Sequence, residues 1–207
     1  NETPAPKLQI NAQTLTDRGY VNAAQAINQI TSTIPTAIVG KNDGLSTGSG
    51  QQFPNLFGLG EGRTLTLVNG RRFVTSSNGL QESRVDASLI PTGLIEAIEV
   101  VQAGGAVVYG TDAIAGVVNY RLKHDFSGIE LDGQTGISSR GDYPEYSLRG
   151  TAGTNFGDGR GNIAINIEWS KTRPLLTKSR PLSNISFITQ SNAADTGPND
   201  GIPSQEL

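Results

Sequence analysis

Hydrophobic and polar residues alternate along three segments in the second half of the chain, residues 129–137, 146–156 and 162–170. The large apolar side chains share one face of each segment, and they are Ile129, Leu131, Ile137, Tyr146, Leu148, Ala152, Phe156, Ile163, Ile165, Ile167 and Trp169. The other face carries Glu130, Asp132, Gln134, Arg149, Asn155, Asn166 and Glu168. Alternation with a period of two predicts three β-strands, each with one apolar and one polar face.

The length of these segments bears on their environment. Each spans about 9–11 residues, which is the length at which a tilted strand crosses a bilayer. An apolar outer face and a polar inner face, with aromatic residues near the strand ends, are typical of a membrane β-barrel. Tyr146, Phe156 and Trp169 lie at or near the segment ends. The edge of a soluble β-sandwich would alternate in the same way, and this alternative stays open.

The connections between the segments differ in length. Residues 157–161 form a tight glycine-rich turn, residues 138–145 form a longer link, and the tail from Lys171 to Leu207 is longer still. Membrane barrels keep short turns on the periplasmic side and long loops outside, so the tail is predicted to be an outer loop. Three strands cannot close a barrel, because their edges would leave backbone N–H and C=O groups unpaired in lipid. We therefore expect the same chain or a second chain to supply the remainder.

The first forty residues are predicted to contain a strand, a helix and a second strand. Leu8–Ile10 can form a short strand, and residues 11–19 are typical of a turn. Apolar positions three residues apart then predict a helix of about three turns, with Val21, Ala24, Ile27 and Ile30 on one face. Asn22 is a candidate cap for this helix, and Pro35 prevents its continuation. The run Thr36–Val39 is a plausible second strand.

The middle of the chain combines a hairpin signal with a glycine cluster. The run 63–73 is rich in β-forming residues and holds an Asn-Gly pair, which favours positive φ at both central turn positions. Pro91 opens a predicted short helix that leads into a strand at Ile98–Val101. The cluster 104–116 precedes a further strand at 117–122, and by itself it favours an ordinary strand–turn–strand in an α/β core. The glycines expected to be structural are Gly70, Gly104, Gly105, Gly110 and Gly116. We expect Asp112 to brace the turn around Gly110.

Composition removes several classes of function. The 207 residues include 26 Gly and 10 Pro, only 35% are hydrophobic, and this balance favours a turn-rich β or α+β chain over a helix bundle. The net charge of −3 gives no basic field for nucleic acid. The absence of Cys excludes a disulfide framework, and a single His argues against a His-based metal site or catalytic triad. Neither a phosphate-binding loop nor a dinucleotide-binding glycine pattern is present, so we predict that the chain is no enzyme.

The order of three motifs resembles the plug domain of TonB-dependent outer-membrane receptors. The first is 63–73 with its Asn-Gly turn, the second is Val85–Pro91 with the run 94–101 after it, and the third is the glycine cluster 104–120. The resemblance implies an α+β plug domain, a small mixed sheet with short helices, over residues 1–125. Residues 126–207 are then the first antiparallel strands and an outer loop of a transmembrane β-barrel that is incomplete in this chain.

The resemblance also implies a function. In this family the plug fills the barrel lumen, a ligand lands on its outward loops, and the periplasmic protein TonB pulls on a TonB box with energy from an inner-membrane complex. The location implied is the outer membrane of a Gram-negative bacterium, in contact with its lipid. The ligand would be a scarce small molecule or oligosaccharide, such as a siderophore or a vitamin, and no cofactor is implied. No recognisable TonB box precedes Leu8. The alternative is a structural, non-transporting part of an outer-membrane assembly.

Two polar loops and a set of charges are the candidate site residues. The residues expected to face a ligand are Asn42, Asp43, Gln51, Gln52, Phe53, Ser76, Ser77, Asn78 and Gln81. A plug that rearranges inside a barrel needs a polar contact surface, because ion pairs and wet hydrogen bonds exchange for water at modest cost. The residues expected at that plug–barrel interface are Arg63, Arg71, Arg72, Arg84, Glu96, Glu99 and Arg121. Phe57 stands where the family often has an Arg before Gly58-Leu59-Gly60, so no ion pair is transferred to that position.

Overall fold

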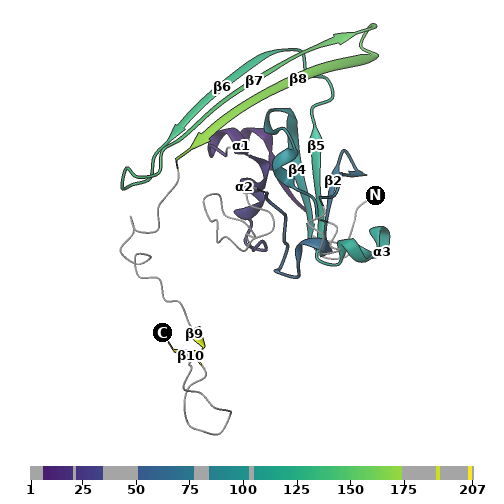
Figure 1. Ribbon diagram of the computed structural model, residues 1–207. Coiled ribbons are helices and arrows are strands. Elements are labelled where there is room, and N and C mark those ends of the chain that lie inside the picture. Colours follow the sequence, from purple (N-terminus) through teal and green to yellow (C-terminus); the bar gives the residue numbers. More distant parts are fainter. Residues whose placement is uncertain are drawn as a thin grey trace, which may run out of the picture. The chain divides into compact units, whose positions relative to one another are not determined.

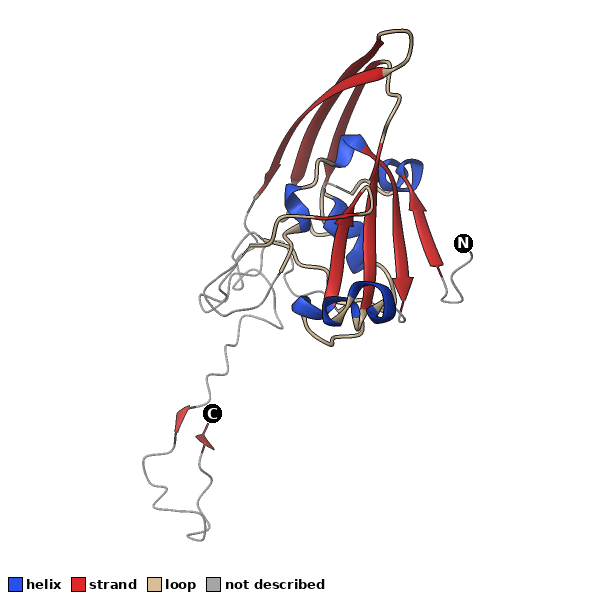
Figure 2. Ribbon diagram, turned by 90° about the vertical axis from the view of Figure 1, so that its right-hand side faces the viewer, coloured by secondary structure: helices blue, strands red, loops and turns tan. Residues whose placement is uncertain are grey.

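The computed structural model describes residues 7–20, 22–34, 51–76, 84–102, 105–173, 190–191 and 205–206. Its first half forms a five-stranded mixed sheet in the order β1-β4-β5-β2-β3 (Figures 1 and 2). The strands are β1 (Lys7–Asn11), β2 (Thr64–Val68), β3 (Arg71–Arg72), β4 (Ile95–Gln102) and β5 (Gly116–Leu122). Strands β2 and β5 are parallel and the other neighbours are antiparallel. We call this sheet, with the helices between its strands, the plug.

Short helices connect the strands of the plug. They are α1 (Ala12–Asp17), α2 (Ala23–Asn28) and α3 (Ala106–Tyr109), with the 3₁₀ turns η1 (Glu61–Arg63), η2 (Ala87–Leu89), η3 (Thr92–Leu94) and η4 (Thr111–Ala113). The main core lies where α1 and α2 pack on one face of the sheet, and it contains Ile27, Ile98, Val118 and Tyr120. A smaller core on the other face includes Leu65 and Leu67 of β2 with Ala113 of η4. The prediction of a mixed sheet with short helices is therefore confirmed.

The N-terminal segment confirms one prediction and corrects another. The strand predicted at Leu8–Ile10 is present as β1, and the Asn22 side chain accepts a hydrogen bond from the Gln25 amide, as predicted for the cap of α2. The prediction of a turn over residues 11–19 is wrong, because α1 occupies most of it. Leu15, the single buried residue of α1, packs into the main core. This tertiary contact stabilises the helix, although the polar sequence of the segment does not predict one. The strand predicted at Thr36–Val39 lies outside the described residues.

The predicted Asn-Gly hairpin between β2 and β3 is confirmed. Asn69 and Gly70 have φ values of +49° and +75°, the left-handed conformations that a two-residue hairpin turn requires. The Asn69 side chain also accepts a hydrogen bond from the Leu122 amide at 2.8 Å, and the Gly70 amide donates to the Asn119 side chain at 2.9 Å. The turn thus fastens β2 to its parallel neighbour β5.

Residues 128–172 form the three antiparallel strands predicted from their alternation. They are β6 (Gly128–Gly136), β7 (Glu145–Phe156) and β8 (Gly161–Thr172), in that order in the sheet, and Figure 1 shows them as long curved strands. The turn at 157–160 is tight, with Asp158 and Gly159 at positive φ. We call this sheet the wall. Residues 137–144 and 173–207 form a separate compact unit, in which β9 (Gln190–Ser191) pairs antiparallel with β10 (Gln205–Glu206).

Candidate functional site

The glycine cluster is needed for close packing and for left-handed turns. Gly105 is buried, and a Cβ placed on it would lie 2.7 Å from Cγ2 of Val117. Gly110 and Gly116 have φ values of +85° and +148°, which side chains other than hydrogen rarely allow. Gly104 lies outside the described residues. The cluster forms α3 and η4 rather than a simple strand–turn–strand.

Asp112 braces this turn through an arginine of the neighbouring hairpin. The Arg72 guanidinium on β3 donates to the Asp112 carboxylate and, at 2.8 Å, to the Tyr109 carbonyl at the end of α3. One side chain therefore holds both helical pieces of the cluster against the sheet. The prediction that Asp112 has a structural role near Gly110 is confirmed.

The residues predicted to face a ligand fall into three groups. Gln51 and Ser76 are half-buried, whereas Gln52 and Phe53 are buried, with 5% and 7% of their surface exposed. The Gln52 amide donates to the buried Asp86 carboxylate at 3.0 Å, so this part of the loop is fixed by main-chain contacts. The other five, Asn42, Asp43, Ser77, Asn78 and Gln81, lie outside the described residues. Ligand contact by any of the nine stays a prediction.

Six of the seven charged residues predicted for the plug–barrel interface have side-chain contacts inside the plug. Arg84 pairs with Glu61 at 2.6 Å and lies over the Phe53 ring at 5.2 Å, while Arg63 donates to the Leu59 carbonyl at 2.8 Å. Arg72 holds Asp112, Arg121 pairs with Glu96 and Glu99, and Arg71 is exposed on β3. Their contact with a barrel stays a prediction.

Glu99 is the centre of a charged cluster on the sheet face opposite α1 and α2. Burial raises the pKa of this carboxyl, but hydrogen bonds from Lys7 at 2.9 Å, Asn119 at 3.1 Å and Arg121 at 3.4 Å outweigh burial. The net effect is a pKa below the ordinary value for glutamate. The cluster ties β1, β4 and β5 together, because each of these strands supplies at least one member.

A row of three charged residues crosses the wall. Asp132, Arg149 and Glu168 stand directly opposite one another on β6, β7 and β8. Nη1 of Arg149 lies 3.5 Å from Oδ1 of Asp132, and its Nε lies 3.3 Å from Oε1 of Glu168. The arginine side chain is 9% exposed and each acid is 29% exposed. A cation between two directly opposed anions favours this register of the three strands.

The same row reaches main-chain atoms of the plug. Nη2 of Arg149 donates to the carbonyl of Tyr20, between α1 and α2, at 3.2 Å. The Glu168 carboxylate accepts the amide of Gly93, in η3, at 2.7 Å. Because both plug partners are backbone groups, the contacts depend on where the chain passes rather than on which side chain it carries.

The backbone of Gly93 closely approaches side chains of the wall. A Cβ on this residue would lie 2.1 Å from Nδ2 of Asn166, 2.7 Å from Oγ1 of Thr151 and 2.9 Å from Cδ of Arg149. Thr151 is buried and accepts a hydrogen bond from Asn166 at 2.8 Å. A Cβ fits here only if these three side chains move, since their atoms occupy the space that it needs.

Further polar contacts surround this point. Gln134 of β6 donates to the Thr16 carbonyl of α1 at 3.4 Å, and Lys123 pairs with Glu130 at 2.7 Å. Between these contacts lies a cavity of about 270 Å³, lined by residues of α1, η3, β6 and β7. A polar cavity of this size has room for several water molecules. The plug therefore meets the wall through ion pairs, hydrogen bonds and a polar hollow.

The opposite face of the wall is apolar and uncovered among the described residues. Nine large side chains on it are between 44% and 80% exposed, namely Ile129, Leu131, Tyr146, Leu148, Phe156, Ile163, Ile165, Ile167 and Trp169. A contiguous apolar surface of this kind marks a contact with another protein or with lipid. The wall has one polar face toward the plug and one apolar face away from it.

Sequence reasoning assigned the interface to plug charges and missed the residues that make the contacts. Asp132, Arg149 and Glu168 were recognised only as polar positions of the alternation. Their signal was an acid, a base and an acid near the middle of three successive strands. Tyr20 and Gly93 gave no signal, because they contribute only a carbonyl and an amide.

The described residues contain no helix long and apolar enough to cross a membrane. They also contain no group of three or more His, Cys, Asp or Glu side chains placed to hold a metal ion. Neither finding adds a second candidate site to the plug–wall contact.

Comparison with known proteins places the chain in a family. The chain is 31% identical over 134 residues to the ferric enterobactin receptor of Pseudomonas aeruginosa and 32% identical over 123 residues to the vitamin B12 transporter of Vibrio cholerae. These matches cover 61% and 58% of the chain but only 17% and 19% of the relatives, so it spans less than a fifth of their length.

Solved structures share the fold. A crystal structure of a mutant ferric enterobactin receptor from Pseudomonas aeruginosa, bound to enterobactin, matches 84% of the chain and 26% of its own length, with a TM-score of 0.62 and 20% identity. Residues 1–117, more than half of the chain, match the family described as TonB-dependent Receptor Plug Domain. The chain therefore belongs to the TonB-dependent receptor plug family, whose members are non-enzymatic proteins of the Gram-negative outer membrane.

Proposed function

We propose that this chain supplies the gate and the first wall strands of an outer-membrane receptor that takes up a scarce ligand with energy delivered through TonB. In this proposal residues 1–125 are the plug, and residues 126–207 are the first strands and an outer loop of the barrel. The ligand class is a siderophore, a vitamin or an oligosaccharide. Two of the relatives are named for ferric enterobactin and for vitamin B12.

The observation that carries the proposal is the two-faced wall. Its inner face contacts the plug through Arg149, Glu168 and Gln134, whereas its outer face exposes nine large apolar side chains. Strands β7 and β8 have 12 residues each and β6 has 9, enough for tilted strands to cross the hydrocarbon core of a bilayer. This is the arrangement of a strand that faces lipid on one side and a filled lumen on the other.

The chemistry of the inner contact suits a gate. An apolar plug surface would be held by the hydrophobic effect, and its separation from the wall would expose that surface to water. The hydrogen bonds to Tyr20, Gly93 and Thr16 are replaced by hydrogen bonds to water when the surfaces separate. Each such exchange costs about 0.5–3 kcal/mol, depending on whether a charged group takes part. A modest force can therefore release the plug one contact at a time.

Uptake by cells tests the function. We would delete the chromosomal gene that encodes the chain and restore it, and then measure uptake of labelled ferric siderophores, vitamin B12 and oligosaccharides, with and without a protonophore. The proposal expects uptake of one ligand to disappear with the gene and to require the proton gradient. Unchanged uptake of every ligand, together with copurification of the protein in a large assembly, would favour the structural alternative.

A disulfide tether tests the gate. The Cβ position of Gly93 lies 2.7 Å from Oγ1 of Thr151, which places Gly93→Cys and Thr151→Cys within reach of a disulfide. An Asn166→Ala background removes the nearest obstructing atom, Nδ2 at 2.1 Å, and leaves the flexible Arg149 side chain, with Cδ at 2.9 Å, to shift. The chain has no native cysteine to interfere.

The matched control pairs Thr151→Cys with Glu130→Cys, which stands directly opposite on β6 and links wall to wall. Oxidation is expected to stop uptake in the plug–wall pair only, and dithiothreitol to restore it. Full uptake with a complete plug–wall disulfide would contradict separation of plug and wall at Gly93.

A further inference from the structure

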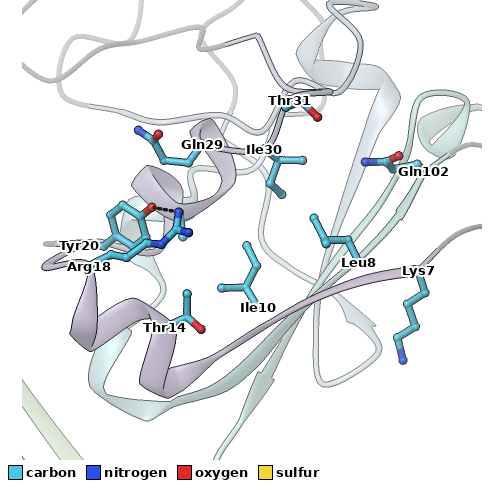
Figure 3. A pocket seen from close by; sticks show the side chains of 11 residues that line it. Lys7, Leu8, Ile10, Thr14, Arg18, Tyr20, Gln29, Ile30, Thr31 and Gln102 are labelled. Atoms are coloured by element: carbon cyan, nitrogen blue, oxygen red, sulfur yellow. Dashed lines mark hydrogen bonds between the residues drawn. The ribbon is translucent and has the colours of Figure 1, made fainter.

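A groove of about 510 Å³ follows β1, the edge strand of the plug sheet (Figure 3). Leu8 and Ile10 of β1 and Ile30 beyond α2 line its middle, while Arg18 and Tyr20 stand at one end. The middle of the groove is therefore apolar, its rim includes the polar residues Thr14, Gln29, Thr31 and Gln102, and Arg18 places a cation at one end. Asp132, Arg149 and Glu168 do not line it.

The backbone of β1 offers an unpaired strand edge. Among the described residues, β1 pairs only with β4, through the five residues Lys7–Asn11. Alternate residues of such a strand direct N–H and C=O groups away from the sheet, where another strand can bind them. The opposite edge differs, because β3 has only two residues. The long free edge and the groove occur together at β1.

The charge at the end of the groove lacks an acidic partner among the described residues. Arg18 donates to the Tyr20 hydroxyl at 3.4 Å, and no described carboxylate forms a salt bridge with it. Lys7, near the other end, is neutralised by Glu99 at 2.9 Å. Leu8 is 40% exposed, although it stands next to the buried Ile30. The groove thus presents one available positive charge and an exposed apolar side chain.

We propose that the β1 groove binds an extended, acidic segment of a partner protein by strand addition. The partner's main chain pairs with the free edge of β1. Its alternate apolar side chains contact Leu8, Ile10 and Ile30, and one carboxylate pairs with Arg18. Strand addition obtains affinity from main-chain hydrogen bonds and specificity from contacts with alternate side chains. The edge of β1 offers the first, and the groove beside Leu8 and Ile10 offers the second. A second copy of β1 is a poorer occupant, because its sequence Lys-Leu-Gln-Ile-Asn has no acid to offer Arg18.

Two synthetic peptides provide the test. Both are capped heptamers, one alternating valine with glutamate and the other alternating valine with lysine, and each carries a fluorophore for anisotropy measurements on the whole chain in detergent micelles. The wild-type chain is expected to bind the glutamate peptide at least tenfold more tightly than the lysine peptide. Bound peptide is also expected to slow hydrogen exchange of alternate amides in residues 7–11.

Variants assign the binding to the groove. Arg18→Glu is expected to weaken the glutamate peptide about tenfold and to strengthen the lysine peptide, since the charge at the end of the groove is reversed. Leu8→Asp is expected to weaken both peptides, because this exposed residue contributes apolar contact rather than core packing. The matched control is Arg71→Glu on β3, at the opposite edge of the same sheet, which should leave both affinities unchanged.

Three results would overturn the proposal. One is equal affinity of the wild-type chain for the two peptides, and another is loss of affinity in Arg71→Glu as large as in Arg18→Glu. The third is dimerisation of the chain through β1 that excludes the peptide, detected by a disulfide between two copies of Gln9→Cys. Circular dichroism of each variant shows whether the fold is retained. If Arg18→Glu fails to fold, the Leu8→Asp variant and the exchange pattern of residues 7–11 still decide the outcome.

Discussion

Arg149, the central residue of the charged row, is predicted to stabilise both the wall and its contact with the plug. We would replace Arg149 by methionine, which keeps the length and much of the volume of the side chain but removes its charge and donors. The change breaks both salt bridges and the bond to the Tyr20 carbonyl. It also leaves Asp132 and Glu168 as two unpaired acids on adjacent strands. The plug should therefore lose its contact with the wall at Tyr20, and the wall should become less stable.

The expected cost follows from burial and distance. Removing one partner from a fully buried ion pair costs about 3–5 kcal/mol. The acids here are 29% exposed and the bridges measure 3.3 and 3.5 Å, so water can rehydrate part of the released charge. The hydrogen bond from a charged group to the Tyr20 carbonyl adds to the loss, and we expect a total of about 2–4 kcal/mol.

A second variant separates two causes of the stability loss, the missing attraction to Arg149 and the repulsion and desolvation of the two unpaired acids. Adding Asp132→Asn and Glu168→Gln to Arg149→Met removes the unpaired charges and should recover more than half of the lost stability, since neutral or apolar replacements of whole buried ion pairs are well tolerated. The bond to Tyr20 stays lost, so recovery should be incomplete.

The assay is urea unfolding in detergent micelles. It is followed by the emission of Trp169, the only tryptophan of the chain, which lies on β8 one residue from Glu168. A cost below about 0.5 kcal/mol for Arg149→Met would refute the reasoning, because that is the effect of an ordinary surface substitution. The reasoning would also be refuted if the triple variant were less stable than Arg149→Met alone. The unpaired acids would then account for none of the stability lost in Arg149→Met.

Three further predictions use the same unfolding assay. Gly93→Ala should lower the free energy of unfolding by about 1–3 kcal/mol, because its Cβ would lie 2.1 Å from Nδ2 of Asn166. The control is Gly136→Ala in β6, whose Cβ would have its nearest neighbour at 3.9 Å and which should change the stability little. Because the folded-state pKa of Glu99 is lowered, its contribution to stability is present above the ordinary glutamate pKa of about 4.3 and should be lost as the pH falls through the lower folded value. If the urea midpoint of Glu99→Gln fell with decreasing pH as steeply as that of the wild-type chain, this prediction would be wrong. Tyr120→Phe should raise the free energy of unfolding by about 1 kcal/mol, because its buried hydroxyl has no hydrogen-bond partner among the described residues; a clear loss of stability would contradict this.

The sequence alone determined the features that arise from local periodicity and turn chemistry. Alternation with a period of two defined β6, β7 and β8, because a strand points successive side chains to opposite faces whatever it packs against. The Asn69-Gly70 turn and the Asn22 cap were predicted for the same reason, since each depends on one or two residues and their own backbone. The order of the motifs at 63–73, 85–101 and 104–120 also sufficed for the resemblance to the family.

Tertiary structure alone decided which groups meet across the plug and the wall. The helix α1 was missed because its stability comes from Leu15 in a core assembled from distant strands. The charges chosen for the interface, such as Arg84 and Arg121, find their partners within the plug instead. The contacts that do join plug and wall use the backbone of Tyr20 and Gly93, which every residue carries and no composition reveals. A backbone group becomes specific only through its position, and position is set by the packing of the whole chain.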